Sequence, residues 1–101
     1  MMSWKDYLEM LIKDLFCGEM TSNEVIDSVF SLLEKQALDR NEMLINFQSL
    51  VFVSVYFLEK LENFIEKAKK LNVKIQIKNV PPSIYKVFQV ARASEVLKLC
   101  F

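Results

Sequence analysis

The chain has 101 residues, the size of one domain with a single hydrophobic core, so residues 1–101 are expected to fold together. Hydrophobic residues make up 52% of it and charged residues 26%, proportions that exclude a disordered chain. One glycine and two prolines are too few for the many tight turns of an all-β sandwich or barrel, which favours helices joined by short connections.

Charge is unevenly distributed although its formal sum is zero. Residues 1–50 contain nine acids and four bases, and residues 51–101 contain four acids and nine bases. Such asymmetry can steer a partner or another copy of the chain. The simpler expectation is that oppositely charged surfaces lie side by side within one domain.

The residue types indicate neither an enzyme nor a cofactor. Without histidine, a Ser-His triad and an imidazole base are excluded, and zinc chemistry is not expected. Neither a recognisable pair of catalytic carboxylates nor a phosphate-binding glycine loop is present. Cys17 and Cys100 lie far apart, and we expect buried thiols in a reducing cytosol rather than a disulfide.

A secreted or membrane-spanning protein is not indicated. The first ten residues contain acids where a signal peptide needs a basic end and an unbroken apolar run. The longest apolar run, residues 50–58, is interrupted by Ser54 and has about half of the roughly 20 residues that a membrane span requires. We therefore expect a cytoplasmic protein that does not bind a membrane.

The first two segments have the apolar spacing of amphipathic helices. Residues 3–16 are predicted to form one helix, with Gly18 as its C-cap glycine. A second helix is predicted to run to about Ala37, because Thr21 and Glu24 have the form of a capping box. Its expected apolar face comprises Val25, Ile26, Val29, Phe30, Leu32 and Leu33.

The middle of the chain changes from a strand to a helix. Residues 42–47 are short and apolar and predict a buried strand, which residues 50–53 continue or leave as a loop. Ser54 then has the position of a helix N-cap, whose hydroxyl accepts a bond from an unpaired backbone N–H. The apolar face expected behind it comprises Phe57, Leu58, Leu61, Phe64, Ile65, Ala68 and Leu71.

Residues 73–80 alternate between apolar and polar side chains, which predicts a strand with one solvated side. Pro81 and Pro82 end it, and proline suits the first turn of the helix expected over residues 83–93. Residues 94–101 fit either a short helix or a strand. The order of strands and helices predicts an α/β fold with parallel pairing. Because two strands are too few, either part of the N-terminal segment is a strand or another chain completes the sheet.

Two passages of the chain resemble the STAS domain, the fold of bacterial anti-sigma factor antagonists and of the cytoplasmic tail of sulfate transporters. LINFQSLVFVSVYFLEKL resembles its strand, hydrophobic turn and helix, and VKIQIKNVPPSIYKVFQVARASEVL resembles its next strand and helix. GEMTSNEVIDSVFSLLEKQ is a weaker third match. The resemblance implies a small domain with a short, mostly parallel sheet packed with helices, in which residues 1–17 are a helical or divergent N-terminal segment.

The resemblance also implies a switch by phosphorylation of a serine ahead of the helix. Aligned by strand and helix, the family's aspartate falls on Ser54 and its phosphoserine on Val55, and Phe57 replaces a glycine. Ser54 is the candidate phosphoacceptor only if the register slips by one residue. Phe57 is better explained by packing in the core.

The leading functional hypothesis is a non-catalytic STAS-like regulator that binds a protein partner, such as a kinase or an anti-sigma-like protein. The docking surface would combine the turn at residues 20–23 with the helix start at residues 54–60, where an exposed aromatic ring would be an anchor. The candidate partner-binding residues are Met20, Thr21, Ser22, Asn23, Ser54, Tyr56, Glu59 and Lys60.

Two alternatives stay open. A sheet with a free edge could complete itself by forming a homodimer. An anion or nucleic acid could instead bind a lysine-rich face, although lysines near a helix C-terminus commonly complement the helix dipole. That face would comprise Lys67, Lys69, Lys70, Lys74, Lys78 and Lys86.

Overall fold

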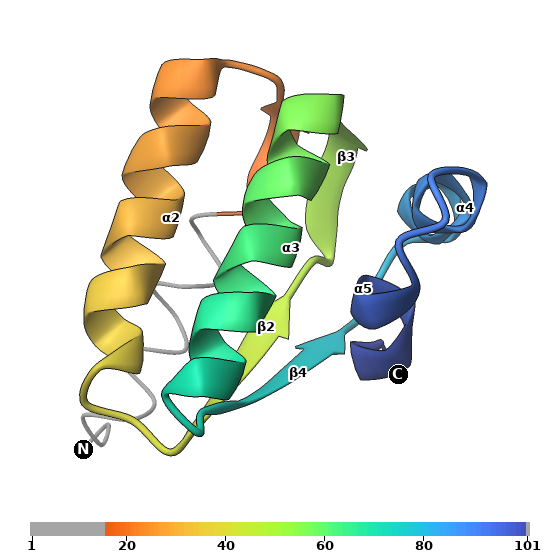
Figure 1. Ribbon diagram of the computed structural model, residues 1–101. Coiled ribbons are helices and arrows are strands. Elements are labelled where there is room, and N and C mark those ends of the chain that lie inside the picture. The colour runs from red at the N-terminus through yellow and green to blue at the C-terminus, as the bar shows by residue number, and fades with distance from the viewer. Residues whose placement is uncertain (1–15, 101) are drawn as a thin grey trace, which may run out of the picture.

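The strands form two parallel two-stranded sheets, and residues 42–53 link them because they supply one strand to each. The computed structural model describes residues 16–100, and in it β2 (Glu42–Asn46) is followed by β3 (Ser49–Val53). β3 pairs in parallel with β1 (Cys17–Met20), and β2 pairs in parallel with β4 (Lys74–Lys78). Figure 1 shows β1 and β4 on opposite sides of this central segment.

The helices follow the strands as the sequence predicts, and the predicted α/β class is confirmed. α2 (Asn23–Ala37) connects β1 to β2, and α3 (Val55–Lys70) connects β3 to β4. The two helices lie side by side on the same face of the strands (Figure 1). α4 (Pro82–Val90) and α5 (Ser94–Leu99) follow β4 at the other side of the molecule, so residues 94–99 are helical.

β1 shows that the further strand is supplied by the N-terminal segment and not by another chain. The strand comes from the N-terminal part of this same chain, and its Cys17 lies outside any helix. Gly18 is therefore not a helix C-cap, and that prediction is wrong. The helix predicted over residues 3–16 lies outside the described residues except for Phe16, which is fully buried.

A bulge in β3 explains the unusual apolar run. Gly18 pairs with Leu50 and Glu19 pairs with Phe52, so Val51 has no partner in β1. The extra residue interrupts the alternation of the strand. Leu50 and Val53 are buried three positions apart, whereas Val51 and Phe52 are 65% and 51% exposed. The run thus supplies both core residues and an apolar surface.

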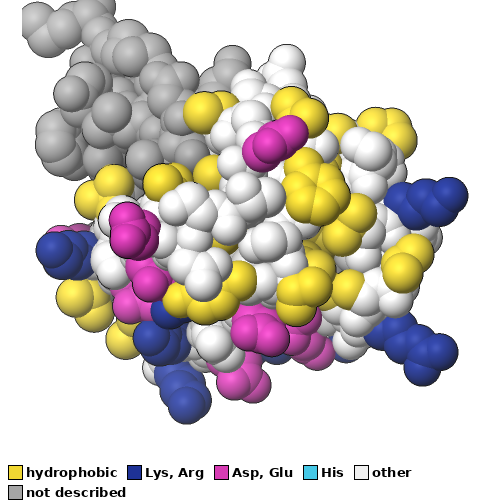
Figure 2. Space-filling model, turned by 90° about the horizontal axis from the view of Figure 1, so that it is seen from above, with side chains coloured by type: hydrophobic (Ala, Val, Ile, Leu, Met, Phe, Trp, Pro, Cys, Tyr) yellow, Lys and Arg dark blue, Asp and Glu magenta, His cyan; other side chains and the backbone are white. Residues whose placement is uncertain are grey.

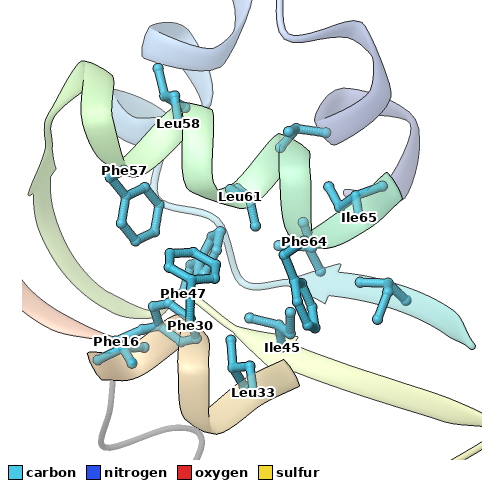
Figure 3. Close-up of a cluster of buried hydrophobic side chains, with 14 of the residues drawn as sticks. Phe16, Phe30, Leu33, Ile45, Phe47, Phe57, Leu58, Leu61, Phe64 and Ile65 are labelled. Carbon is cyan, nitrogen blue, oxygen red and sulfur yellow. The ribbon is translucent and has the colours of Figure 1, made fainter. Parts of the chain in front are cut away.

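Aromatic side chains from several elements meet in the core (Figure 3). The ring of Phe57 packs in edge-on contacts with those of Phe16, Phe30 and Phe47, at centroid distances of 5.4 to 6.0 Å. Phe47 also contacts Phe88 of α4 at 6.3 Å. The cluster therefore fastens α2, α3 and α4 to the central strand segment, and the assignment of Phe57 to the core is confirmed.

The two amphipathic faces are largely as predicted. All predicted residues of the α3 face are buried except Leu71, which follows the helix and is exposed. On α2, Val25 and Leu32 are exposed, because the buried stripe follows Ile26, Val29, Phe30, Leu33 and Ala37. The apolar face of α2 was therefore predicted too wide.

The helix ends are capped by side chains and by left-handed residues. Ser22, not Thr21, is the N-cap of α2, since its Oγ accepts from the Val25 N–H at 3.4 Å. α4 begins with Pro82 in its first turn, as expected. α3 and α4 both end in Schellman motifs, in which Asn72 (φ 59°) and Arg92 (φ 56°) occupy the left-handed position where glycine is usual.

Substitutions at two positions with left-handed backbone should change the free energy of unfolding in opposite directions. Gly18 has a φ of 64° and open space where a Cβ would lie, so Gly18→Ala should destabilise through the backbone alone, by about 1 kcal/mol. Arg92→Gly should instead stabilise by roughly 0.5 kcal/mol, because it relieves a residue with a Cβ at the same kind of position. Urea unfolding followed by circular dichroism measures both. Changes of the same sign would contradict this account of the two turns.

Candidate interaction surface

The β1–α2 turn and the start of α3 meet at the carboxyl ends of two neighbouring parallel strands. The Ser54 N–H donates to the Met20 carbonyl oxygen at 3.2 Å, which joins the two segments directly. Thr21, Ser22 and Asn23 are all exposed beside this contact. The structure therefore brings together the two segments of the predicted docking surface.

Met20 does not belong to that surface, contrary to the prediction. Its side chain is only 3% exposed, because it lies in the last position of β1 opposite the buried Val53. A residue buried in the core cannot contact a partner without unfolding the strand end. The β1–α2 turn contributes only the polar residues that follow it.

Ser54 is the N-cap of α3, as the sequence predicts. Its Oγ accepts from the Phe57 N–H at 3.2 Å, and its own carbonyl oxygen accepts from the Leu58 N–H at 3.2 Å. The residue is half-buried. Val55, the position that aligns with the family's phosphoserine, is 71% exposed but has no hydroxyl group.

Tyr56 is held by a polar cluster that joins α3 to α2. Its hydroxyl donates to Asp27 Oδ1, and Lys60 Nζ lies 3.2 Å from the same oxygen and 5.6 Å from the centre of the Tyr56 ring. The hydrogen bond to Asp27 raises the pKa of Tyr56 above its ordinary value, and the same bond, with Lys60, lowers the pKa of Asp27. Tyr56 is thus already engaged within the chain, whereas Glu59 on the same helix is exposed.

An apolar groove lies on the other side of the α3 start, against α4. It has a volume of about 560 Å³. At its mouth Val55 and Val90 are 71% and 76% exposed, and Phe52 is half exposed. Its lining comprises Phe52, Val53, Ser54, Val55, Leu58, Ser83, Lys86, Val87, Val90 and Ala91. We call it the α3/α4 groove.

Figure 2 views the molecule from the end at which α2 and α3 begin, and hydrophobic side chains gather on this face with basic side chains at its edge. Sequence reasoning missed Phe52, Val87 and Val90, because apolar residues in a strand and a helix are by default assigned to the core. The one signal in the sequence was the unbroken apolar run through residues 50–53, which is longer than alternation with a polar face allows.

The lysine-rich face is partly neutralised within the chain. Lys67 Nζ lies 3.0 Å from Glu34 Oε1, and Lys69 forms an ion pair with Glu95, whose pKa is lowered chiefly by that contact. Asp27 and Lys60 form a second pair between α2 and α3. Two of these contacts join acids of α2 to bases of α3, so the expectation of oppositely charged surfaces side by side is confirmed.

The two cysteines are free thiols, but only one of them is shielded. Cys100 is half-buried, its Sγ–H donates to the Val96 carbonyl oxygen at 3.3 Å, and burial raises its thiol pKa. Cys17 is exposed, so the prediction that it is buried is wrong. Within the described residues no group of three or more acidic or cysteine side chains is placed to hold a metal ion. No helix among them has the length and apolar character needed to cross a bilayer.

Comparison of the chain with models of protein families, with curated proteins and with solved structures finds no match. The function is therefore inferred from the residues and contacts of this chain.

Removing the Asp27 carboxylate should lower the pKa of Tyr56. Because the pKa of Tyr56 is raised in the folded state, its protonated phenol stabilises the fold. That stabilisation is lost as the pH rises through the pKa that Tyr56 has in the folded state. In Asp27→Asn, the ¹³Cζ NMR signal of Tyr56 should titrate at lower pH than in the parent chain. Glu24→Gln, on the same helix, is the control and should leave the titration unchanged. An unchanged midpoint in Asp27→Asn would show that the contact does not persist in solution.

Substitutions of Ser54 should separate its capping role from other roles. Ser54→Ala removes the acceptor for the Phe57 N–H and should destabilise the fold by about 1 kcal/mol. Ser54→Asp retains a capping acceptor and should stay within a few tenths of a kcal/mol of the parent chain. Thermal unfolding by circular dichroism measures both. Equal losses in the two variants would mean that the hydroxyl is needed for something other than capping.

Proposed function

We propose that this protein is a non-catalytic interaction module, a STAS-like regulator of the anti-sigma factor antagonist type that acts in the cytoplasm by binding a protein partner. The observation that carries the proposal is the α3/α4 groove beside the N-cap Ser54. Val55 and Val90 are large apolar side chains more than two-thirds exposed next to Phe52, and grouped apolar exposure of this kind is typical of interaction sites. The docking surface comprises this groove together with Thr21, Ser22, Asn23, Tyr56, Glu59 and Lys60.

The STAS-like assignment is supported by the order of the elements. A parallel strand with a serine at its end, a helix, another parallel strand and a further helix follow one another over residues 42–90, in the order that the resemblance implies. The departures are local. The buried Phe57 replaces a glycine because it fills the centre of the aromatic cluster, and Val55 occupies the usual place of the phosphoserine.

Ser54 remains the candidate phosphoacceptor of the proposed switch. A phosphate there would keep acceptor oxygens at the N-cap and add negative charge at the positive end of the α3 dipole, so the helix would tolerate it. The same charge would lie at the wall of the α3/α4 groove, since Ser54 lines it. Phosphorylation would therefore alter the docking surface rather than the fold. The proposed partner is a protein such as a kinase or an anti-sigma-like protein.

The alternatives differ in how well the contacts support them. For an anion or a nucleic acid on the lysine-rich face, two of the six lysines, Lys67 and Lys69, are already paired with acids of this chain. A homodimer is compatible with the leading proposal, because the same exposed apolar residues could face another copy. We keep self-association as the second candidate for that reason.

An affinity pull-down from the source organism's lysate, with and without ATP, tests the proposal. We expect a partner that the parent chain captures and that Val90→Asp loses. Leu38→Asp is the matched control, since Leu38 is 69% exposed at the far end of α2. Mass spectrometry of the bait should find phosphate on Ser54 when ATP is present. Tyr56→Ala and Glu59→Lys test the rest of the surface. If Val90→Asp, Tyr56→Ala and Glu59→Lys all retain every partner, the proposed docking face is wrong.

A further inference from the structure

α4 has a buried apolar face and, beside it, a stripe of residues that lines the α3/α4 groove. Ile84 and Phe88 are buried, and Phe88 packs on Phe47 in the aromatic cluster, which fixes the helix against the central strands. The adjoining stripe has helical spacing and includes Val87, which is partly buried against the core, and the exposed Val90. Its five residues, Ser83, Lys86, Val87, Val90 and Ala91, all line the α3/α4 groove. A helix anchored on one side therefore presents the exposed Val90 and Lys86 to the groove, beside the partly buried Val87.

The lining of the groove favours a partner segment that is helical over one that is extended. Most of the lining comes from α3 and α4, whose backbone groups are already bonded within the helices, and β3 contributes only its last two residues, Phe52 and Val53. The Ser54 hydroxyl is committed to the Phe57 N–H. An extended peptide would leave most of its backbone polar groups unpaired against apolar side chains, whereas a helix satisfies them internally.

The positive charge at the groove favours a partner segment that carries a carboxylate. Lys86 is exposed and is the charged residue among those that line the groove, and no acid is among them. Within residues 16–100, no acidic side chain forms a salt bridge with it. A carboxylate on the partner would therefore meet a lysine that has no such partner in the described part of this chain.

The same charge argues against two copies meeting groove to groove. An isologous contact places the same residues on both sides, so Lys86 of each copy would approach a surface whose described lining has a lysine and no acid. Like charges in an apolar interface are unfavourable. The groove is better suited to a different chain.

From these observations we infer that the α3/α4 groove binds one amphipathic helix of a partner protein, whose apolar side chains at helical spacing pack on Phe52, Val55 and Val90 and whose flanking carboxylate pairs with Lys86. This inference rests on the proposed function and names the chemistry of the partner. Helices bind apolar grooves in this manner through anchors three, four and seven residues apart.

A charge-exchange experiment tests the inference. The probe is a fluorescein-labelled, designed 16-residue helix with leucines along one face and glutamates beside them, compared with the same peptide carrying lysines in place of the glutamates. Fluorescence anisotropy should show the glutamate peptide binding the parent chain about tenfold more tightly than the lysine peptide. Lys86→Glu should reverse that preference, while Lys35→Glu on α2 should not.

The apolar contact is tested with a variant of the protein, and the helical form of the partner is tested with a modified peptide. Val90→Asp should weaken binding of the glutamate peptide at least about tenfold, and Leu38→Asp should leave it unchanged. A peptide with a central proline should lose binding, because proline breaks the helix. Since Lys86 and Val90 are exposed, circular dichroism should show that Lys86→Glu and Val90→Asp both keep the fold.

The outcomes separate this inference from the proposed function. If Val90→Asp loses the lysate partner but Lys86→Glu does not reverse the peptide preference, the acidic-helix inference is overturned and the docking surface stands. If Val90→Asp affects neither peptide nor partner, the inference is overturned, and the proposed docking face is overturned with it when Tyr56→Ala and Glu59→Lys also retain every partner. A dimer found by light scattering with the parent chain and lost in Val90→Asp would assign the groove to a second copy and overturn the inference.

Discussion

The packing of Phe57 against Phe16, Phe30 and Phe47 is the interaction on which the rest of the structure depends. Each ring comes from a different part of the chain: the residue before β1, α2, the junction of β2 and β3, and the first turn of α3. Edge-on aromatic contacts add to the large apolar area that each ring buries. Since all four side chains are at most 2% exposed, their mutual fit sets the distance between the two long helices and the sheet.

This cluster also determines what the start of α3 can offer to a partner. Phe57 must point inward, so its neighbours in the first turn divide between the two flanks of the helix. Tyr56 is held on the α2 side by Asp27 and Lys60, and Val55 is left exposed on the side of α4. Ser54 caps the helix at the point from which the two flanks diverge. A polar, internally satisfied flank and an apolar, open flank thus follow from the inward position of one ring.

The sequence predicted those features that depend on periodicity, and it did not predict those that depend on register. The buried faces of α2 and α3, the alternation in β4 and the Ser54 cap are local patterns of spacing and side-chain chemistry. The bulge at Val51 is a property of pairing with β1, which lies about 30 residues earlier, so no local pattern specifies it. The left-handed Gly18 was assigned to a helix end for the same reason, because glycine signals a positive φ without saying in which element.

The scarcity of glycine was a sound guide to fold class, but it does not mean that few residues are left-handed. Asn72, Asn79 and Arg92 adopt positive φ at element ends that glycine would otherwise occupy. The candidate surface also has one part that the sequence could predict and one that it could not. The helix start at Ser54 could be predicted from capping rules, whereas Val90 is recognised as a surface residue only once Phe88 is seen to fix the buried face of α4.

The bulge at Val51 adds an exposed apolar side chain to β3 without changing which of its residues enter the core. Without that residue, Leu50, Phe52 and Val53 would follow the regular inward and outward order of a strand, and both core positions would be kept. The insertion or loss of one codon would therefore add or remove exposed apolar area at this end of the molecule while leaving the aromatic centre intact. One residue of length in β3 therefore changes the exposed surface of the strand independently of the core that it helps to build.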